Sequence, residues 1–204
     1  MLSAIKNKVF RASQKRIRTN LLKQIELKLF NVKGFHLKEI YLAEDNRTAI
    51  AIDSNYQSVN LISINKNSIK TCLVRNTDLL AARLIQNAQC FESLSRKSGL
   101  THSQLDTVNS GKIVELIGDT FPSGARVLCL DTTKKNQPCF AIDFCQKDVE
   151  HRKNKKTTRS QAIHWFNICK NIILEGEKKA EEANYRQSFS RLNMAEEIAQ
   201  PKSA

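Results

Sequence analysis

The stretch from residue 126 to residue 173 constrains the fold more than any other part of the chain. It reads as two strands joined by a polar turn, followed by a basic loop and an amphipathic helix. In the second strand Phe140, Ile142 and Phe144 alternate with smaller or polar residues, and Pro138 precedes the run as a strand start. This period of two places the three large side chains on one face, which we expect to lie in the core.

The helix at the end of that stretch has one apolar face. Its apolar residues follow one another at spacings of three and four: Ala162, Trp165, Phe166, Cys169, Ile172 and Ile173. A terminal helix rich in Trp and Phe that follows antiparallel strands is typical of a helix that covers one face of a sheet or plugs one end of an open barrel. The predicted fold class is therefore α+β, an antiparallel sheet or partly open barrel capped by this C-terminal amphipathic helix.

Strands are also expected upstream, where turn signals recur about every ten residues. The apolar pattern predicts strands in four ranges: residues 35–44, 48–53, 59–64 and 66–75. Residues 76–89 either continue the sheet after a short turn or form a helix, and we expect a helical turn at 77–82 that runs into a strand at 83–86. Residues 92–108 are rich in polar side chains and indicate a loop or short helix between two halves, and residues 111–119 indicate another short strand or helix.

The first 31 residues carry more than half of the formal net charge of +13. They hold eight basic residues and a single acidic one, Glu26, which gives this segment a charge of +7. Because the segment lacks Gly and Pro and repeats apolar residues at helical spacing, it predicts a basic amphipathic helix. Two interpretations stay open: residues 17–29 favour an apolar stripe packed on the domain, and residues 1–18 favour an arm lying on anionic lipid or along phosphates.

A second basic cluster lies in the loop at residues 147–159. It is either a solvated loop or a set of flexible cations that contact phosphates with salt-sensitive affinity. No aromatic residue lies within it, so the sequence does not support stacking on bases there. The two clusters supply the candidate residues for binding phosphate or an anionic surface: Lys6, Lys8, Arg11, Lys15, Arg16, Arg18, Arg152, Lys153, Lys155, Lys156 and Arg159.

The sequence divides the chain into three parts. Residues 1–31 form the basic helical arm, residues 32–174 the α+β domain, and residues 175–204 a polar helical extension that ends in a disordered tail. No run approaches the roughly 18 apolar residues that span a bilayer, and the charged start is a poor secretory signal. We therefore expect a cytoplasmic protein, peripheral to the membrane where its arm meets lipid.

The residues suited to chemistry do not form a motif. The six cysteines contain no Cys-x-x-Cys pair, so we expect small buried apolar residues rather than disulfides or zinc ligands. The four histidines also lack a metal-binding spacing. Asp53, Asp131 and Asp143 suggest a divalent-metal nuclease as one alternative, but turn and edge roles explain them more simply. The sequence predicts no enzyme, no cofactor and no metal site.

Several segments together resemble a known group of domains. In the first half they are residues 34–42 (GFHLKEIYL), 48–53 (TAIAID) and 60–64 (NLISI). In the second half they are residues 126–131, 138–144 and 161–173. Over about residues 34–174 the chain resembles uncharacterised bacterial domains of pleckstrin-homology-like (PH-like) architecture, on the pattern of strands rather than on a diagnostic motif.

The resemblance implies a bent, partly open barrel of about seven strands with a C-terminal helix, a fold that serves as a scaffold for binding proteins or lipids. Lipid-binding members concentrate basic residues in the first strand and the turn after it. The turn here is Glu44-Asp45-Asn46-Arg47, so a phosphoinositide pocket is not expected. The expected function is a non-enzymatic bacterial adaptor that binds an unidentified protein partner, with the arm at residues 1–18 helping it to an anionic membrane surface. The alternative is a nucleic-acid-associated protein that contacts phosphates through the arm and the 147–159 loop.

Overall fold

The structure is a computed structural model that describes residues 2–66, 68–86, 89–97, 126–144 and 154–199. It describes the backbone alone in the outer turns of the terminal helices, at residues 2–12, 154–158 and 189–199. The element expected at 111–119 and residues 147–153 of the expected basic loop lie outside the described residues. The expectation of a loop is wrong for residues 154–159, which belong to a helix that begins at Asn154.

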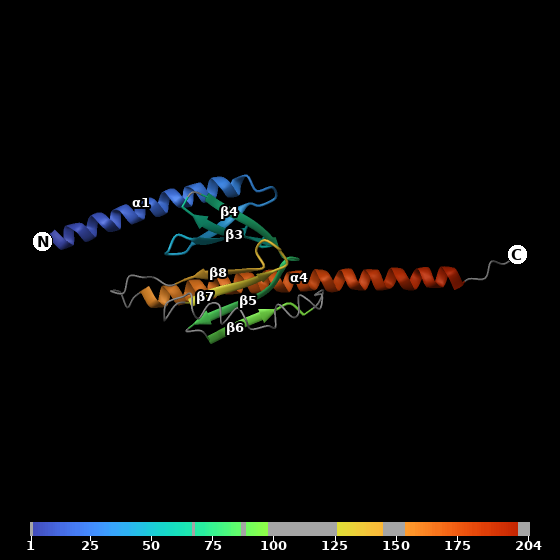
Figure 1. Cartoon of the computed structure of the whole chain (residues 1–204). Coiled ribbons are helices and arrows are strands. Elements are labelled where there is room, and N and C mark those ends of the chain that lie inside the picture. The colour runs from blue at the N-terminus through green and yellow to red at the C-terminus, as the bar shows by residue number, and fades with distance from the viewer. Residues whose placement is uncertain (1, 67, 87–88, 98–125, 145–153, 200–204) are drawn as a thin grey trace.

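The described part of the chain holds two helices and eight strands. In chain order they are α1 (Leu2–Phe30), β1 (Leu37–Leu42), β2 (Thr48–Asp53), β3 (Ser58–Asn65), β4 (Ser68–Arg75), β5 (Leu79–Gln86), β6 (Gln89–Ser95), β7 (Arg126–Thr132), β8 (Cys139–Asp143) and α4 (Asn154–Ala199). All paired strands are antiparallel, and they form two sheets of four strands with the orders β1-β2-β3-β4 and β6-β5-β7-β8. Figure 1 shows α1 along the first sheet and α4 along the second. The predicted α+β class is confirmed.

The first sheet, β1 to β4, is covered on both faces. On one face α1 packs Ile25 and Leu29 against apolar side chains such as Ala49 and Ile62. The other face lines the main core, which the second sheet and α4 share. Double coverage explains why residues 49–53 of β2 are buried one after another, although antiparallel sheets with one solvated face show alternation.

The apolar stripe expected on α1 packs on the domain over its C-terminal half. Ile25 and Leu29 are buried and Leu21 is half-buried, whereas Ile17 is exposed. In Figure 1 the first turns of α1 project beyond the sheet. The helix therefore has a docked half and a projecting half.

The main core joins the second sheet to α4, as the sequence predicts. Phe140 and Ile142 of β8 and Phe144 directly after it are buried and pack in the same cluster as Trp165 and Phe166 of α4. The two sheets meet where β1 approaches β8. There the Tyr41 ring stacks on Phe144 with a centroid distance of 4.3 Å, and the Tyr41 hydroxyl donates to the Asp143 carbonyl oxygen at 3.2 Å. With its two sheets and C-terminal helix the architecture is loosely PH-like.

Two expectations about the middle of the chain are wrong. Residues 77–82 do not form a helical turn, because β5 begins at Leu79 and pairs with β6 on one side and β7 on the other. Residues 92–95 are not a loop, because they belong to β6. Leu and Ala are strong helix formers, and pairing on both sides of β5 overrides that preference. The described residues hold eight strands where the resemblance implies about seven, and β7 pairs with β5 rather than with β6.

The helix α4 leaves the domain at Gly176. A Cβ at this position would collide with the Asn76 carbonyl oxygen, and the Arg96 guanidinium donates to the Gly176 carbonyl oxygen. Only glycine allows this close approach of helix and turn. The helix then continues through Ala199 with exposed side chains at residues 181–188. Neither helix, over its described residues, has a segment apolar enough to cross a membrane.

Candidate functional site

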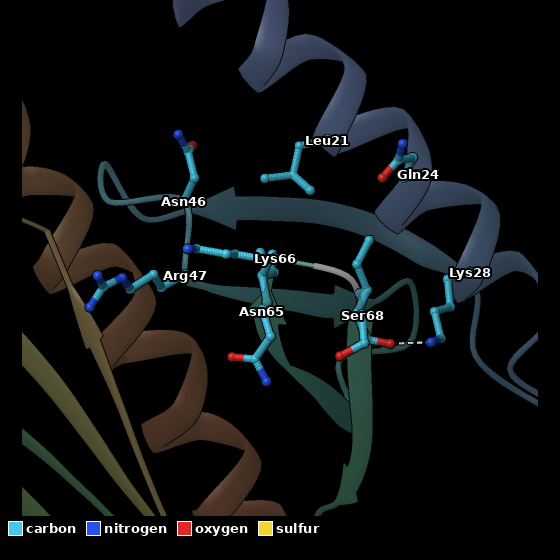
Figure 2. A pocket seen from close by; sticks show the side chains of 10 residues that line it. Leu21, Gln24, Lys28, Asn46, Arg47, Asn65, Lys66 and Ser68 are labelled. Carbon is cyan, nitrogen blue, oxygen red and sulfur yellow. Dashed lines mark hydrogen bonds between the residues drawn. The ribbon is translucent and has the colours of Figure 1, made fainter.

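A cleft of about 830 Å³ opens between α1 and the turns at one end of the first sheet. Its lining comes from α1 (Leu21, Gln24, Lys28), from the turn between β1 and β2 (Asn46, Arg47) and from the hairpin of β3 and β4 (Ile64, Asn65, Lys66, Ser68, Ile69). Figure 2 shows the α1 side chains facing the two turns across this space. The described lining residues include three cations and no carboxylate.

Two basic side chains fix α1 beside the cleft. The Arg18 guanidinium donates to the Ala43 carbonyl oxygen at 2.9 Å and to Asn46 Oδ1 at 3.2 Å, and it also donates to the carbonyl oxygen of Leu42. Further along the helix, Lys28 Nζ donates to the Ile69 carbonyl oxygen on β4, the bond drawn in Figure 2. The helix is thus tethered to the β1–β2 turn at one point and to β4 at another.

The acidic residues of the β1–β2 turn do not line the cleft. Asp45 Oδ1 accepts a hydrogen bond from the Arg47 backbone N–H at 2.9 Å, which closes the turn on itself. Burial raises the pKa of Tyr41, and the nearby carboxylates of Glu44, Asp143 and Asp45 raise it further. Of the four turn residues, only Asn46 and Arg47 line the cleft. The turn also holds two carboxylates, Glu44 and Asp45, but neither lines the cleft. The described lining of the cleft therefore stays positive.

The cations of the cleft differ from the candidates chosen from the sequence. Arg47 and Lys66 lie outside both basic clusters of the sequence, and Lys28 belongs to the basic first 31 residues but was not among the candidates. The signal that points to Arg47 is its position in the turn expected between the strands at 35–44 and 48–53, whereas Lys66 was expected to begin the strand at 66–75. Loops held by a rigid scaffold are frequent carriers of binding residues.

The structure separates the sequence-predicted residues into groups. Lys15 and Arg16 are exposed on α1, whereas Arg18 is half-buried and tethers that helix. Lys6, Lys8 and Arg11 lie on the projecting turns of α1, Lys155 and Lys156 lie in the first turn of α4, and Arg152 and Lys153 fall outside the described residues. In Figure 1 the start of α1 and the start of α4 point toward the same end of the molecule. The expectation that these residues bind anions stays a prediction.

Arg159 meets an aromatic ring that the sequence gave no reason to place there. Its guanidinium carbon lies 5.7 Å from the ring centroid of Phe91, which is 56% exposed on the outer strand β6. Arg126 lines the same small hollow, and its Nε donates to Gln86 Oε1 at 3.2 Å. The fold thus supplies the basic cluster with an exposed aromatic face from a distant strand.

The cysteines only partly match the expectation of small buried residues. Cys129 and Cys169 are buried, whereas Cys90 and Cys139 are exposed because they lie on the two outermost strands of the second sheet. All five cysteines that the structure describes are free. Burial raises the pKa of the Cys169 thiol to about 12, and burial is also the main cause of the raised pKa of Cys129. These two thiols stay protonated at neutral pH and are poor nucleophiles.

The three aspartates of the metal-nuclease alternative lie apart. Asp53 Oδ1 accepts the His36 backbone N–H at 3.1 Å, Asp131 pairs with Arg83 inside the second sheet, and Asp143 ends β8. Within the described ranges, no three His, Cys, Asp or Glu residues come close enough together to hold a metal ion.

Comparison with known proteins gave no match. No protein-family model, no curated protein and no solved structure is significantly similar to this chain.

Proposed function

We propose that the protein is a non-enzymatic binding module, an adaptor of PH-like architecture, that holds an acidic region of a protein partner in the cleft between α1 and the first sheet. One observation carries this proposal: Lys28, Arg47 and Lys66 line the cleft without a carboxylate among the described lining residues. A volume of about 830 Å³ lies within the usual range of ligand-binding clefts, roughly 300–1,000 Å³. Cations in such a concave site attract anions and steer their approach.

A charge-reversal pair with a matched control tests the cleft. The probe is a fluorescently labelled polyglutamate peptide, and binding is followed by fluorescence anisotropy at low salt. Arg47→Glu with Lys66→Glu should abolish measurable binding, because it turns two attractive charges into repulsive ones. The control, Lys178→Glu with Lys179→Glu on the exposed part of α4, changes the net charge by the same amount and should keep most of the affinity. Equal losses of polyglutamate affinity in the two double variants would contradict a binding site in the cleft.

A stripe on the outer face of α1 supports contact with an anionic membrane surface. Arg16, Lys23, Leu27 and Phe30 follow at helical spacing and are all exposed, Leu27 by 69% and Phe30 by 87%. Two large apolar side chains beside two cations match the pattern of a helix that lies in the membrane interface. In this proposal the protein is cytoplasmic and peripheral to the membrane.

Vesicle sedimentation tests the membrane contact. Leu27→Ser with Phe30→Ser should weaken binding to vesicles of phosphatidylcholine and phosphatidylserine at least tenfold, because burying each side chain contributes about 1.5–3 kcal/mol. The control is Ile17→Ser, which removes an exposed apolar residue from another face of the same helix. Unchanged binding of the double variant would remove the membrane from the proposal.

The nucleic-acid alternative is favoured by a different observation, the contact between Arg159 and Phe91. An exposed ring beside two arginines can stack on a base while the cations contact phosphates. If this alternative is right, Phe91→Ala weakens binding of a single-stranded oligonucleotide by about 5- to 150-fold, the range expected for loss of one stacked base. Polyglutamate binding should not change in the same variant. If Phe91→Ala binds the oligonucleotide as tightly as the unmodified protein does, base stacking on Phe91 is excluded and only non-specific charge attraction remains.

A further inference from the structure

The strand β4 is the last strand of the first sheet, and its outer edge faces no other strand among the described residues. In an antiparallel pair, backbone groups alternate between bonding the neighbouring strand and pointing away from it. The structure identifies which residues point outward. The Ile69 carbonyl oxygen accepts Lys28 Nζ, and the Arg75 backbone bonds Asp78 through its N–H at 3.3 Å and its carbonyl oxygen at 2.9 Å. Thr71 and Leu73 share this outward alternation.

The outward N–H and carbonyl groups of Thr71 and Leu73 have no hydrogen-bond partner among the described residues. The side chains of Thr71 and Leu73 are half-buried, so this edge packs against the rest of the domain. An edge of this kind is a template on which a further strand can pair. Proteins use such edges to bind extended peptides, whose main chain supplies most of the hydrogen bonds.

Hollow space runs along this edge. A second groove of about 530 Å³ lies between Thr71 and Cys72 on one side and the β7–β8 turn, at Asn136 and Gln137, on the other. It shares Lys28 and Ile69 with the basic cleft, so the two hollows adjoin one another. The part of the free edge at Thr71 therefore lies in a groove that continues from the proposed anion site, and Leu73 follows two residues beyond it on the same edge.

The far rim of the groove is fixed in place by Asp78. Its carboxylate accepts Thr133 Oγ1 at 3.1 Å and Lys134 Nζ at 2.8 Å, and its carbonyl oxygen accepts the Thr133 N–H at 2.9 Å. These bonds join the turn after β4 to the β7–β8 turn. Because the rim is tied to the same strand that offers the free edge, the groove has a defined width before anything binds.

Charge selects the occupant. Lys28 and Lys70 line the second groove, and no carboxylate is among its described lining residues. A second copy of the chain that paired through its own β4 would bring these lysines against the same lysines, so self-pairing is disfavoured. An extended strand with acidic side chains meets them favourably.

We propose that the outer edge of β4 accepts an extended acidic segment of a partner protein as an added strand, bonded to the backbone of Thr71 and Leu73. This inference rests on the proposed adaptor function and gives the partner a chemical class and a position. The basic cleft then holds acidic side chains at one end of the segment, while the groove holds its main chain.

The test uses the full chain and a fluorescently labelled seven-residue peptide of alternating glutamate and valine. Thr71→Pro removes the outward N–H at a position where an edge strand tolerates proline, and Thr71→Val keeps the backbone intact. We expect Thr71→Pro to bind at least about tenfold more weakly than Thr71→Val, because it loses a strand-pairing bond and its ring blocks the edge. Equal affinities of the two variants would overturn the proposal.

Two measurements on the unmodified protein keep the test independent of how the proline variant folds. The same peptide with every amide N-methylated retains its charge but cannot donate to β4, so its binding should be lost. In hydrogen exchange, the Thr71 and Leu73 amides should become protected when the unmethylated peptide is added. Full binding of the methylated peptide, absence of protection, or no binding of the unmethylated peptide would each overturn the proposal. Failure of the polyglutamate test in the cleft, with Thr71-dependent binding intact, would instead count against the cleft alone.

Discussion

The first sheet is built from strands that follow one another in the chain, whereas the second brings together strands separated by a long connection. Two residues of sequence separate β3 from β4, but β6 ends at Ser95 and β7 begins only at Arg126. The sheets also treat buried polar groups differently. In the second, Arg83 of β5 pairs with Oδ2 of the fully buried Asp131 of β7, although Asp131 Oδ1 has no hydrogen-bond partner among the described residues. In the first, neither polar atom of the buried Asn60 amide has such a partner.

The difference indicates how each sheet keeps its register. Short turns fix the pairing of consecutive strands, so β3 and β4 need no polar pair to align them. The pairing of β5 with β7 has no such local guide, and a buried ion pair across two strands penalises any other register, since a slip leaves a charge unpaired.

Removal of the Arg83 side chain should have the largest effect. Burial raises the pKa of Asp131 and the Arg83 guanidinium opposes that rise. Arg83→Leu leaves the carboxyl group buried without its cation and should lower the free energy of unfolding by about 3–5 kcal/mol, measured by urea denaturation. The double variant Arg83→Leu with Asp131→Leu should recover most of this loss. If the free energy of unfolding of Arg83→Leu lies within 1 kcal/mol of that of the unmodified protein, the ion pair does not stabilise the second sheet.

Loss of the Arg18 tether should have the next largest effect and should be confined to the first sheet. Arg18→Gln removes charged hydrogen bonds to the β1–β2 turn and should cost about 1–3 kcal/mol of unfolding free energy. Arg16→Gln is the matched control, because Arg16 is exposed two residues away. Hydrogen exchange should speed up along α1 in Arg18→Gln and stay unchanged in β5 and β7. Faster exchange in both sheets alike would contradict separate stabilisation of the two sheets.

Replacement of Asn60 should have a smaller effect of the opposite sign. The Asn60 amide is fully buried on β3, and neither of its polar atoms has a hydrogen-bond partner among the described residues. Burial of the amide therefore costs desolvation free energy that no hydrogen bond compensates. Asn60→Val introduces a strand-forming residue and should raise the free energy of unfolding by about 1 kcal/mol, again measured by urea denaturation. A loss of stability would mean that the Asn60 amide has a role in the first sheet that the apolar replacement cannot supply.

The same contrast explains which parts of the fold the sequence could predict. The predicted strand at 48–53 coincides with β2, and Phe140, Ile142 and Phe144 lie in the core, because alternation and nearby turns are local signals. The region around Leu79 was predicted wrongly because its Leu-Leu-Ala-Ala run favours a helix, and only pairing with the distant β7 makes it a strand. The order of the second sheet likewise depends on contacts that no local pattern encodes.

The candidate site was harder to predict than the fold. Its three cations come one each from α1, the β1–β2 turn and the β3–β4 hairpin, and two of them, Arg47 and Lys66, lie outside the basic clusters of the sequence. Phe91 lies 68 residues before Arg159, and the sequence gave no reason to join them. Conversely Arg18, which the density of charge selected, uses its guanidinium to hold α1. Basic clusters in sequence and basic clefts in space are therefore different observations, and only the fold supplies the second.

The smallest predicted effect concerns Asp78, which lies where the sheets meet at the β4–β5 turn. Burial alone would raise the pKa of Asp78, but the hydrogen bonds donated by Lys134, the Arg75 backbone and Thr133 outweigh it and lower the pKa. A carboxyl group whose pKa is lower in the folded state stabilises that state at pH values above its unfolded pKa of about 4, and the contribution disappears as the pH falls through the folded pKa.

Asp78→Asn should therefore lower the thermal unfolding midpoint at pH 7 and at pH 5 by a similar amount, and the gap to the unmodified protein should narrow below about pH 4. Glu26→Gln, a change at an exposed acid on α1, serves as the control. Because the Asp78 bonds tie the β7–β8 turn to the end of β4, the variant should also loosen the far rim of the groove, and hydrogen exchange at the Thr133 amide should rise with little change inside either sheet. A gap that stays constant from pH 7 to pH 3 would mean that the link between the sheets does not depend on the charge of Asp78.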